Sequence, residues 1–282
     1  MKPDLELDIE CFNLKYTLEC GQCFRWEKVD ETTYIGVIQD RVIKITQNGN
    51  KIYIWSSLKE NLKQVVYDYF DLAKDYTCLE KDIAELDSNV KESLKYSSGI
   101  HILNQPLFET IISYIISANN NIKRISRSVK DISKKYGTKV MFEDKEYYLF
   151  PTLNEMKNAS VDELLACGTG FRARYIKNTI KCFEENKDFL YELEKQDTVA
   201  ARKMLTSLMG VGPKVADCIL LFALKRGEVF PVDVWVKRIM EKLYFKSDVS
   251  IKKISKFANE KFGEHAGIVQ QHLFHNVREG NI

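Results

Sequence analysis

The side chains best suited to chemistry in this sequence are a lysine and an aspartate that flank one expected helix, Lys214 and Asp233. Lys214 follows the turn Gly210-Val211-Gly212 and Pro213, so it falls in the first helical turn, where the positive end of the helix dipole disfavours a cation. That position favours the neutral, nucleophilic form of the amine. A carboxylate held near such an amine can stabilise positive charge that develops in a reaction. A solvated lysine beside an ordinary turn is the alternative.

Glycines, a proline and the aspartate itself define the elements that must hold these two side chains. Glycine accepts a positive φ, so the two glycines allow a tight turn, and Pro213 favours the start of a helix that we expect to run to about Leu224. The free amides at the start of that helix form a site for one anion such as a phosphate. Asp233 precedes an apolar run beginning at Val234, so we first expect it to cap a helix. Capping and catalysis are compatible roles for one carboxylate.

A family resemblance rests on this same stretch. The segment LMGVGPKVAD, residues 208–217, followed by Val232-Asp233, resembles the helix-hairpin-helix and Gly/Pro-Asp signature of a DNA glycosylase superfamily. Within it, Lys214 and the pattern Val215-Ala216-Asp217-Cys218 are similar to the 8-oxoguanine DNA glycosylases, and the similarity extends from about residue 14 to residue 274. The resemblance implies a bifunctional DNA glycosylase/AP lyase of base excision repair that acts on 8-oxoguanine in duplex DNA.

The resemblance also assigns roles in the reaction. Lys214 corresponds to the nucleophile, which attacks the sugar C1′, displaces the base and becomes a Schiff base with the opened sugar. That intermediate permits β-elimination, so we expect a nick 3′ of the lesion. Asp233 corresponds to the acidic partner that stabilises positive charge on the sugar and orients or deprotonates the amine. We expect no metal or organic cofactor.

Four further residues correspond to the base pocket of that family. Gly21 matches the glycine whose carbonyl accepts the N7 proton of 8-oxoguanine and repels the N7 lone pair of normal guanine. Gln270 and Phe274 share a helix face and match the residues that hydrogen-bond the Watson–Crick edge and stack on the ring. Cys218 matches the residue against the opposite face of the base. By its pattern alone, Phe274 would be assigned to the core.

A separate set of residues corresponds to the reader of the opposite strand. Asn119 and Arg124 match residues that contact the cytosine left unpaired across from the lesion, and Arg172 matches a second arginine there. Phe171 stands where the eukaryotic pattern has tyrosine, so the wedge can stack but lacks a hydroxyl donor. Trp235 replaces a histidine expected after Val-Asp-Val, which removes a contact to phosphate or to the aspartate. We therefore expect a relaxed preference for cytosine, and we assign the hairpin glycines to the same DNA-binding surface.

Composition limits the class of protein. The chain has 282 residues, a formal net charge of +2 and 45% hydrophobic residues, which suits a globular protein of two or three packed subdomains. So small a net charge does not by itself indicate a nucleic-acid partner. No apolar run could span a bilayer and the acidic N-terminus lacks a signal-peptide pattern, so we expect an intracellular protein without membrane contact, cytoplasmic or nucleoid-associated if bacterial. The expected partner is double-stranded DNA containing 8-oxoguanine, bound by a monomer.

Seven scattered cysteines, an odd number, indicate reduced thiols rather than a disulfide framework. Cys20 and Cys23 form a CxxC pair, which could be half a zinc site or a redox pair. The sequence has no second CxxC, and the C-terminal histidines are more typical of surface or hydrogen-bonded side chains, so we expect no metal site. No cysteine follows Cys218, so the iron–sulfur loop of endonuclease III-type relatives is absent.

The periodicity predicts an α+β fold: an N-terminal antiparallel sheet domain with covering helices, residues 1–95, packed on a mainly helical helix-hairpin-helix body, residues 96–282, whose C-terminal helix completes the base pocket. Alternating apolar residues and the Asn48-Gly49 turn indicate the sheet. Strands are expected over 12–18, 23–26, 34–38, 41–45 and 51–55. Helices are expected over 57–70, 107–116, 122–136, 160–166, 174–183, 199–208, 213–224, 234–243, 251–262 and 267–278.

Basic side chains cluster in the helix expected over 122–136 and again around residues 172–177. Such a run is usually a solvated helix face, but the neighbouring segments 119–121 and 168–170 supply amide and backbone donors, which favours a DNA surface. The cluster consists of Lys123, Arg124, Arg127, Lys130, Lys134 and Lys135, with Arg172, Arg174 and Lys177.

Two other functions fit part of the pattern. A glycosylase of another lesion specificity, such as one for adenine or alkylpurines, would share the hairpin, although purely monofunctional members have no need of Lys214. A non-enzymatic helix-hairpin-helix module would grip the DNA backbone alone, and it would leave a pocket of Gly21, Gln270 and Phe274 unexplained.

Overall fold

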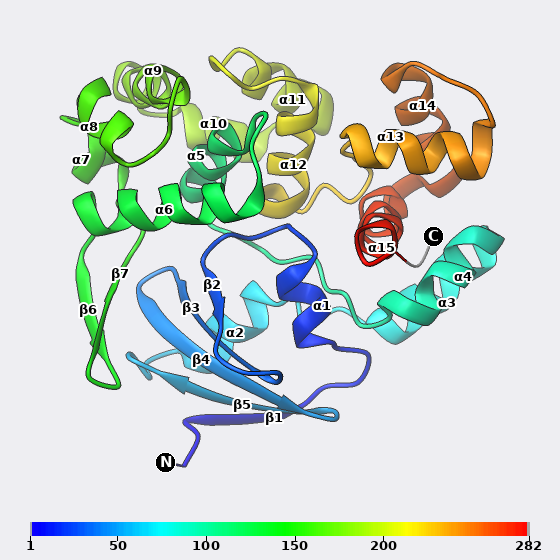
Figure 1. Cartoon of the computed structure of the whole chain (residues 1–282), viewed down its shortest axis with the longest axis horizontal. Helices are drawn as coiled ribbons and strands as arrows, with labels where there is room; N and C mark the ends of the chain where they lie inside the picture. The colour runs from blue at the N-terminus through cyan, green and yellow to red at the C-terminus, as the bar shows by residue number, and fades with distance from the viewer. Residues whose placement is uncertain (1, 281–282) are drawn as a thin grey trace.

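The N-terminal part of the chain is an antiparallel β-sheet and the remainder is mainly helical, as predicted (Figure 1). The computed structural model describes residues 2–280. Within those residues, five strands pair in the order β1-β5-β4-β3-β2. The second strand begins only at Trp26, so the strand predicted over 23–26 was mostly wrong. The strands are β1 (Leu5–Asp8), β2 (Trp26–Lys28), β3 (Thr33–Ile38), β4 (Arg41–Asn48) and β5 (Lys51–Ser56).

The first helix replaces a strand that we predicted. We expected an extended segment over 12–18, but α1 (Leu14–Glu19) lies there. The Asn13 side chain caps α1 by accepting a hydrogen bond at 2.9 Å from the amide three residues later. Leu14 and Leu18 are both buried in the core shared with the sheet. The prediction was wrong because a spacing of four satisfies both the alternation of a strand and the period of a helix.

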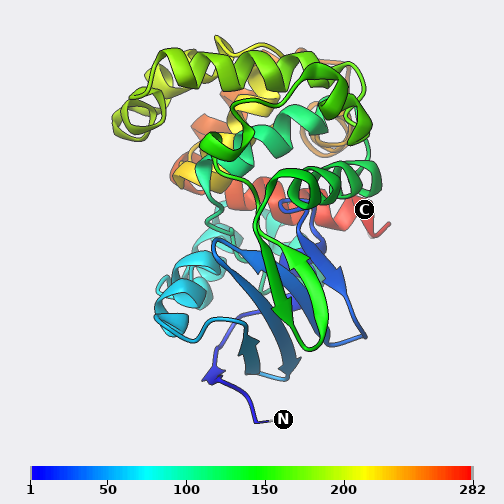
Figure 2. The same ribbon diagram turned by 90° about the vertical axis from the view of Figure 1, so that its left-hand side faces the viewer.

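The sheet has both of its faces covered. On one face, Ile45 and Ile54, which are opposite each other in the β4–β5 register, belong to a core that includes α1 and α2 (Leu62–Tyr69). On the other face lies a hairpin that we did not predict, β6 (Lys139–Phe142) and β7 (Lys145–Tyr148). Figure 2 shows this hairpin running from the helical body down along the sheet. It gave little sequence signal because its turn places Glu143 and Asp144 at φ values of 47° and 59°, which such residues seldom adopt.

Two apolar helices form the centre of the helical body. α5 (Leu107–Ser117) and α12 (Pro213–Leu224) pack together through fully buried residues of one core, such as Ile115 and Leu220. α12 begins and ends at the predicted residues. Its start is fixed by Pro213, which favours the first helical position. The same core includes α6 (Ile122–Tyr136), α7 (Leu153–Met156), α8 (Val161–Ala166), α9 (Arg172–Glu185), α10 (Phe189–Lys195) and α11 (Thr198–Thr206).

A second group of helices joins early and late segments of the chain. α3 (Tyr76–Leu86) and α4 (Ser88–Ser97) share a core with the C-terminal helices, and Figure 1 shows them beside α15, apart from the sheet. The domain division at residue 95 stays a prediction, and packing groups α3 and α4 with the C-terminal helices. No helix within residues 2–280 is long and apolar enough to cross a membrane. The C-terminal members are α13 (Val234–Met240), η1 (Glu241–Phe245), α14 (Ile251–Phe262), η2 (Gly263–His265) and α15 (Ala266–Arg278).

Candidate active site

The predicted catalytic and base-binding residues surround one small cavity. It has a volume of about 50 Å³ and lies where α5, α12, α15 and the loop after α1 meet. Typical small-molecule sites measure about 300 Å³ or more, so a nucleobase must widen this cavity to enter. The reactive amine and carboxylate therefore line the same cavity as the residues expected to bind the base. The lining residues are Cys20, Gly21, Tyr114, Lys214, Cys218, Phe222, Pro231, Asp233, Gln270, Gln271 and Phe274.

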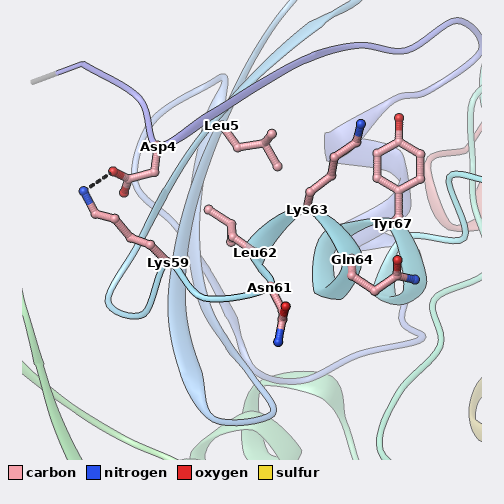
Figure 3. Close-up of a pocket in the computed structure, with 8 residues that line it drawn as sticks. All are labelled: Asp4, Leu5, Lys59, Asn61, Leu62, Lys63, Gln64 and Tyr67. Atoms are coloured by element: carbon pink, nitrogen blue, oxygen red, sulfur yellow. Dashed lines mark ion pairs between the residues drawn. The ribbon is translucent and has the colours of Figure 1, made fainter.

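A larger hollow lies elsewhere in the molecule. It is a groove of about 530 Å³ between the start of β1 and α2, and none of its residues was predicted to be functional (Figure 3). Of its three charged side chains, Asp4 and Lys59 neutralise each other in an ion pair with 2.6 Å between Oδ1 and Nζ, and the third is Lys63. Its remaining lining residues are Leu5, Asn61, Leu62, Gln64 and Tyr67.

Lys214 occupies the first turn of α12, as predicted, and its side chain is partly buried. Its Nζ lies 5.4 Å from the centre of the Tyr114 ring, which forms one wall of the cavity. One helical turn later, burial raises the pKa of the Cys218 thiol, and the nearby Lys214 ammonium opposes that rise. No ion pair within residues 2–280 includes Lys214. The amine thus rests against an aromatic face and a neutral thiol, from which it can turn toward a sugar carbon.

Asp233 caps α13, as predicted, and lines the same cavity. Its Oδ1 accepts a hydrogen bond from the Val236 amide at 2.8 Å, which fixes the carboxylate at the helix start. Within residues 2–280, this is the one hydrogen bond that the Asp233 carboxylate accepts. Its other oxygen, Oδ2, is therefore available to the amine or the sugar. Burial is the main cause that raises the pKa of Cys218, and Asp233 adds to the rise. Asp233 and Lys214 therefore reach the same cavity from two elements.

The loop that carries Gly21 is held firmly against the cavity. Gly21 has a φ of +87°, which favours glycine, and a β-carbon there would lie 3.6 Å from Cε1 of Phe274. The next residue, Gln22, is fully buried, and its Nε2 donates to the carbonyls of Thr17 at 2.9 Å and His101 at 2.7 Å. Gln22 therefore fixes the loop whose carbonyl is predicted to read the base.

The two cysteines beside Gly21 are buried free thiols. Burial raises the pKa of Cys20 to about 12 and that of Cys23 well above its usual range. Their sulfurs donate to the carbonyls of Thr17 at 3.3 Å and Leu18 at 3.6 Å, which are local packing contacts of the loop. In residues 2–280, no group of three His, Cys, Asp or Glu side chains is arranged to hold a metal ion. The CxxC pair thus fits a packing role.

The hairpin before α12 depends on one of its two glycines for its shape. Gly210 has a φ of +84°, and a β-carbon there would lie 2.4 Å from Cδ2 of Tyr175. Gly212 has a φ of −88°, so of the two hairpin glycines Gly210 is the one that supplies the positive φ of the turn. A β-carbon on Gly212 would meet no described atom within 4 Å, and no side chain caps α12, so its first amides are open to an anion. Trp235, 54% exposed at the start of α13, lies 5.3 Å from the Arg238 guanidinium.

The residues predicted to read the opposite strand lie just after α5 and at the starts of α6 and α9. Asn119 and Arg124 are exposed, and Phe171 is 54% exposed. Arg172 is buried instead, because its guanidinium donates to the carbonyls of Ala118 and Asn119, both at 2.7 Å, and stacks 4.3 Å from the centre of the Phe171 ring. Arg172 therefore positions the Asn119 loop and the Phe171 ring. Its direct contact with the opposite base stays a prediction.

The basic face of α6 is partly neutralised by neighbouring acids. Lys130 pairs with Glu27 at 2.6 Å, and Lys135 pairs with Glu163 at 3.2 Å. Only part of the run is therefore available for DNA phosphates. In the described part of the chain, the α6 cations without an ion pair are Lys123, Arg124 and Lys134.

Five lining residues of the cavity were not predicted. Tyr114 and Phe222 lie in apolar runs that predict core helices, and only tertiary packing shows that they border the site. Gln271 carried a weak signal, because a second glutamine beside Gln270 interrupts the apolar face of α15. The other two are Cys20 and Pro231.

Models of two protein-domain families together match most of the chain. The model of the 8-oxoguanine DNA glycosylase N-terminal domain matches residues 4–111, and that of HhH-GPD superfamily base excision DNA repair proteins matches residues 112–264. A probable N-glycosylase/DNA lyase of Methanothermobacter thermautotrophicus is 33% identical over 246 residues, covering 80% of this chain and 77% of that protein.

Two further matches extend over most of the chain. N-glycosylase/DNA lyase OGG1 of Arabidopsis thaliana is 29% identical over 278 residues, covering 93% of this chain and 76% of that protein. A similar solved structure is the crystal structure of the Clostridium acetobutylicum 8-oxoguanine glycosylase/lyase in complex with double-stranded DNA containing cytosine opposite 8-oxoguanine. The sequence in that structure is 38% identical to this chain. The structural match covers 100% of both chains with a TM-score of 0.93. The similarity therefore includes both the sheet and the helical body.

Proposed function

The chain belongs to the 8-oxoguanine DNA glycosylase family of the HhH-GPD superfamily, and from this membership we propose that it excises 8-oxoguanine from duplex DNA and then cuts the strand. One observation supports the site that we assign to this reaction. The Lys214 amine and the Asp233 carboxylate line one cavity with Gly21, Gln270 and Phe274. The protein acts as a monomer in this proposal, because one chain supplies every residue of the cavity.

The target nucleotide must leave the base stack and open the cavity before reaction. In the cavity the Gly21 carbonyl accepts the N7 proton that 8-oxoguanine has and guanine lacks. The ring of Phe274, which borders Gly21, stacks on one face of the base, and Cys218 lies against the other. Recognition thus uses a fixed carbonyl and two apolar walls.

The reaction joins Lys214 to the sugar. The neutral amine bonds to C1′ as the C1′–N9 bond breaks, and the base leaves with a proton. Loss of a proton from nitrogen and opening of the C1′–O4′ bond, with a proton going to O4′, give the Schiff base. Removal of a proton from C2′ then expels the 3′ phosphate. The free oxygen of Asp233 stabilises the positive charge at the sugar and orients the amine.

Borohydride trapping tests this chemistry directly. Reduction during turnover of an 8-oxoguanine duplex should give a covalent protein–DNA adduct that maps to Lys214, because a reduced Schiff base is a stable secondary amine. Absence of an adduct from protein that excises the base would refute the Schiff-base mechanism. A duplex with normal guanine at the same position is the control and should give no adduct.

A further inference from the structure

A second glutamine lines the cavity beside the predicted base reader. Gln271 is 4% exposed, and its Nε2 donates to Oε1 of Gln270 at 2.6 Å. Its own Oε1 is buried and has no hydrogen-bond partner among residues 2–280. A buried acceptor that remains unsatisfied costs free energy, so each such group in a native protein calls for a ligand or a water molecule.

Gln22 shows how a purely structural glutamine behaves in the same chain. It is as buried as Gln271, yet its Nε2 donates to two carbonyls and its Oε1 accepts from the Leu103 amide at 2.9 Å. The protein therefore satisfies both amide atoms of a glutamine whose role is to hold a loop. Gln271 keeps its Oε1 unsatisfied, and Gln271 is one of the residues that line the cavity.

The hydrogen bond between the two glutamines determines what they can offer a ligand. Whichever amide donates, the bond uses one carbonyl oxygen and one N–H, so one carbonyl oxygen and further N–H groups remain. The Watson–Crick edge of guanine presents an acceptor, O6, beside two donors, N1–H and N2–H. The edge of adenine presents the reverse order, a donor at N6 beside an acceptor at N1. A paired donor and acceptor can therefore distinguish the two purines.

We propose that Gln271 determines specificity together with Gln270, its Oε1 accepting N1–H or N2–H of the flipped base while the Gln270 amide donates to O6. The inference rests on the proposed function and adds that two parts of the cavity select different features of the base. The glutamine pair selects a guanine-type edge over an adenine-type edge, and the Gly21 carbonyl selects the oxidised base over the normal one.

The variant Gln271→Met tests the pair, because methionine has a similar length and no acceptor oxygen. Single-turnover excision would be measured on matched duplexes with 8-oxoguanine or 8-oxoadenine opposite cytosine. Lyase activity on a preformed abasic site, which has no base to read, reports the folded active site. We expect 8-oxoguanine excision to fall roughly 10- to 100-fold, with 8-oxoadenine excision and abasic-site cleavage within about twofold of wild type.

The matched control is Gln22→Met, which removes a structural glutamine. It should lower the unfolding temperature and slow excision of both bases together, leaving their ratio unchanged. An active wild type whose Gln271→Met variant keeps both rates would overturn the inference alone and would indicate a buried water at Oε1. Wild-type protein without 8-oxoguanine excision would overturn the proposed function as well. If Gln271→Met does not fold, the test is the comparison of the two bases with the wild-type protein. Excision of 8-oxoadenine as fast as that of 8-oxoguanine would overturn the inference, and excision of 8-oxoadenine at least about 100-fold slower would support it.

Discussion

The larger of the two hollows described above has the less reactive lining, and the smaller one gathers the reactive groups. The groove beside β1 and α2 measures about 530 Å³, but it is lined by nearby segments of the first 67 residues, and its one acid, Asp4, is neutralised by Lys59. The cavity of about 50 Å³ gathers side chains from the loop after α1, from α5 and α12, and from the C-terminal helices. Convergence of reactive groups from distant segments, rather than volume, therefore marks the candidate active site.

Removal of the Lys214 amine, the reactive group that distinguishes the cavity from the groove, should have the largest effect on excision. Lys214→Gln should bind DNA as wild type and lose excision by at least about 1,000-fold, because the glutamine amide is no nucleophile. Single-turnover cleavage and a gel-shift titration measure the two properties. Lys225→Gln, at the far end of α12, is the matched control and should excise normally. A Lys214→Gln variant that excises at the wild-type rate would remove the chemical distinction between cavity and groove.

Acid should lower the free energy of unfolding through His272, which is buried and follows Gln271 in α15. Burial, with a contribution from His275, lowers the pKa of His272 from 6.5 to about 3. The unfolded chain therefore takes up the proton first, so this contribution to stability is complete above pH 6.5 and is lost as the pH falls toward 3. The loss should reach at most about 5 kcal/mol.

Urea unfolding between pH 7.5 and pH 4 measures this dependence. His272→Gln should flatten the curve, and the same change at the partly exposed His265 should leave it as in wild type. A curve that is equally steep in His272→Gln would assign the acid sensitivity to other groups.

Addition of a single methyl group at Gly21 should separate recognition from backbone strain. Gly21→Ala places a side chain at positive φ beside Phe274, so excision of 8-oxoguanine should fall about tenfold or more and stability by about 1–2 kcal/mol. Gly49→Ala is the control, because Gly49 has a φ of +60° with no described atom near its β-carbon. It should lose similar stability and keep full excision. Equal loss of excision in both variants would show that the Gly21 loop has no special part in recognition.

Phe171→Tyr should have a smaller effect, on the choice of the opposite base. The added hydroxyl restores a hydrogen-bond donor to an exposed ring beside Arg172, so preference for cytosine should increase a few-fold. Excision rates with each of the four bases opposite 8-oxoguanine measure this preference. If the wild type already prefers cytosine as strongly as Phe171→Tyr does, the missing hydroxyl does not relax it.

Lys59→Ala, in the groove, should have the smallest effect. The variant breaks the ion pair with Asp4, but the Lys59 side chain is 75% exposed, where such pairs contribute little. Excision and the unfolding temperature should both match wild type within error. A clear loss of excision would show that the groove belongs to the functional surface.

The sequence predicted best those features that depend on short-range chemistry. Pro213 and the Asp233 cap set the starts of α12 and α13 at the expected residues, because a proline and a capping carboxylate act within one turn. The same local information misled at residues 12–18, where buried leucines four apart fit both strand and helix. The β6–β7 hairpin was missed because Glu143 and Asp144 are unusual residues for its turn.

Local sequence patterns indicated Lys214 and Asp233, and the other predicted lining residues of the cavity were named by the family motif. Lys214, Cys218 and Phe274 carry the family pattern, and the structure brings them together. Tyr114 and Gln271 were missed because the sequence cannot tell which side of a buried helix borders a cavity of such small volume. Burial of Arg172 was missed for a related reason, since its carbonyl partners lie in a loop more than fifty residues earlier.

The anchoring of the Gly21 loop by Gln22 has a consequence for how this protein can diversify. The Gly21 loop that inspects the base and the amine that attacks the sugar lie far apart in the sequence, and Gln22 fixes the loop by donating to the carbonyls of residues 17 and 101. Tyr114 links the two, because its hydroxyl donates to the Gln22 carbonyl at 3.2 Å and its ring centre lies 5.4 Å from the Lys214 amine. A change in the Gly21 loop that keeps the Gln22 carbonyl in place should therefore leave the position of the attacking amine unchanged. Such a separation gives evolution, and protein engineers, a route to new targets.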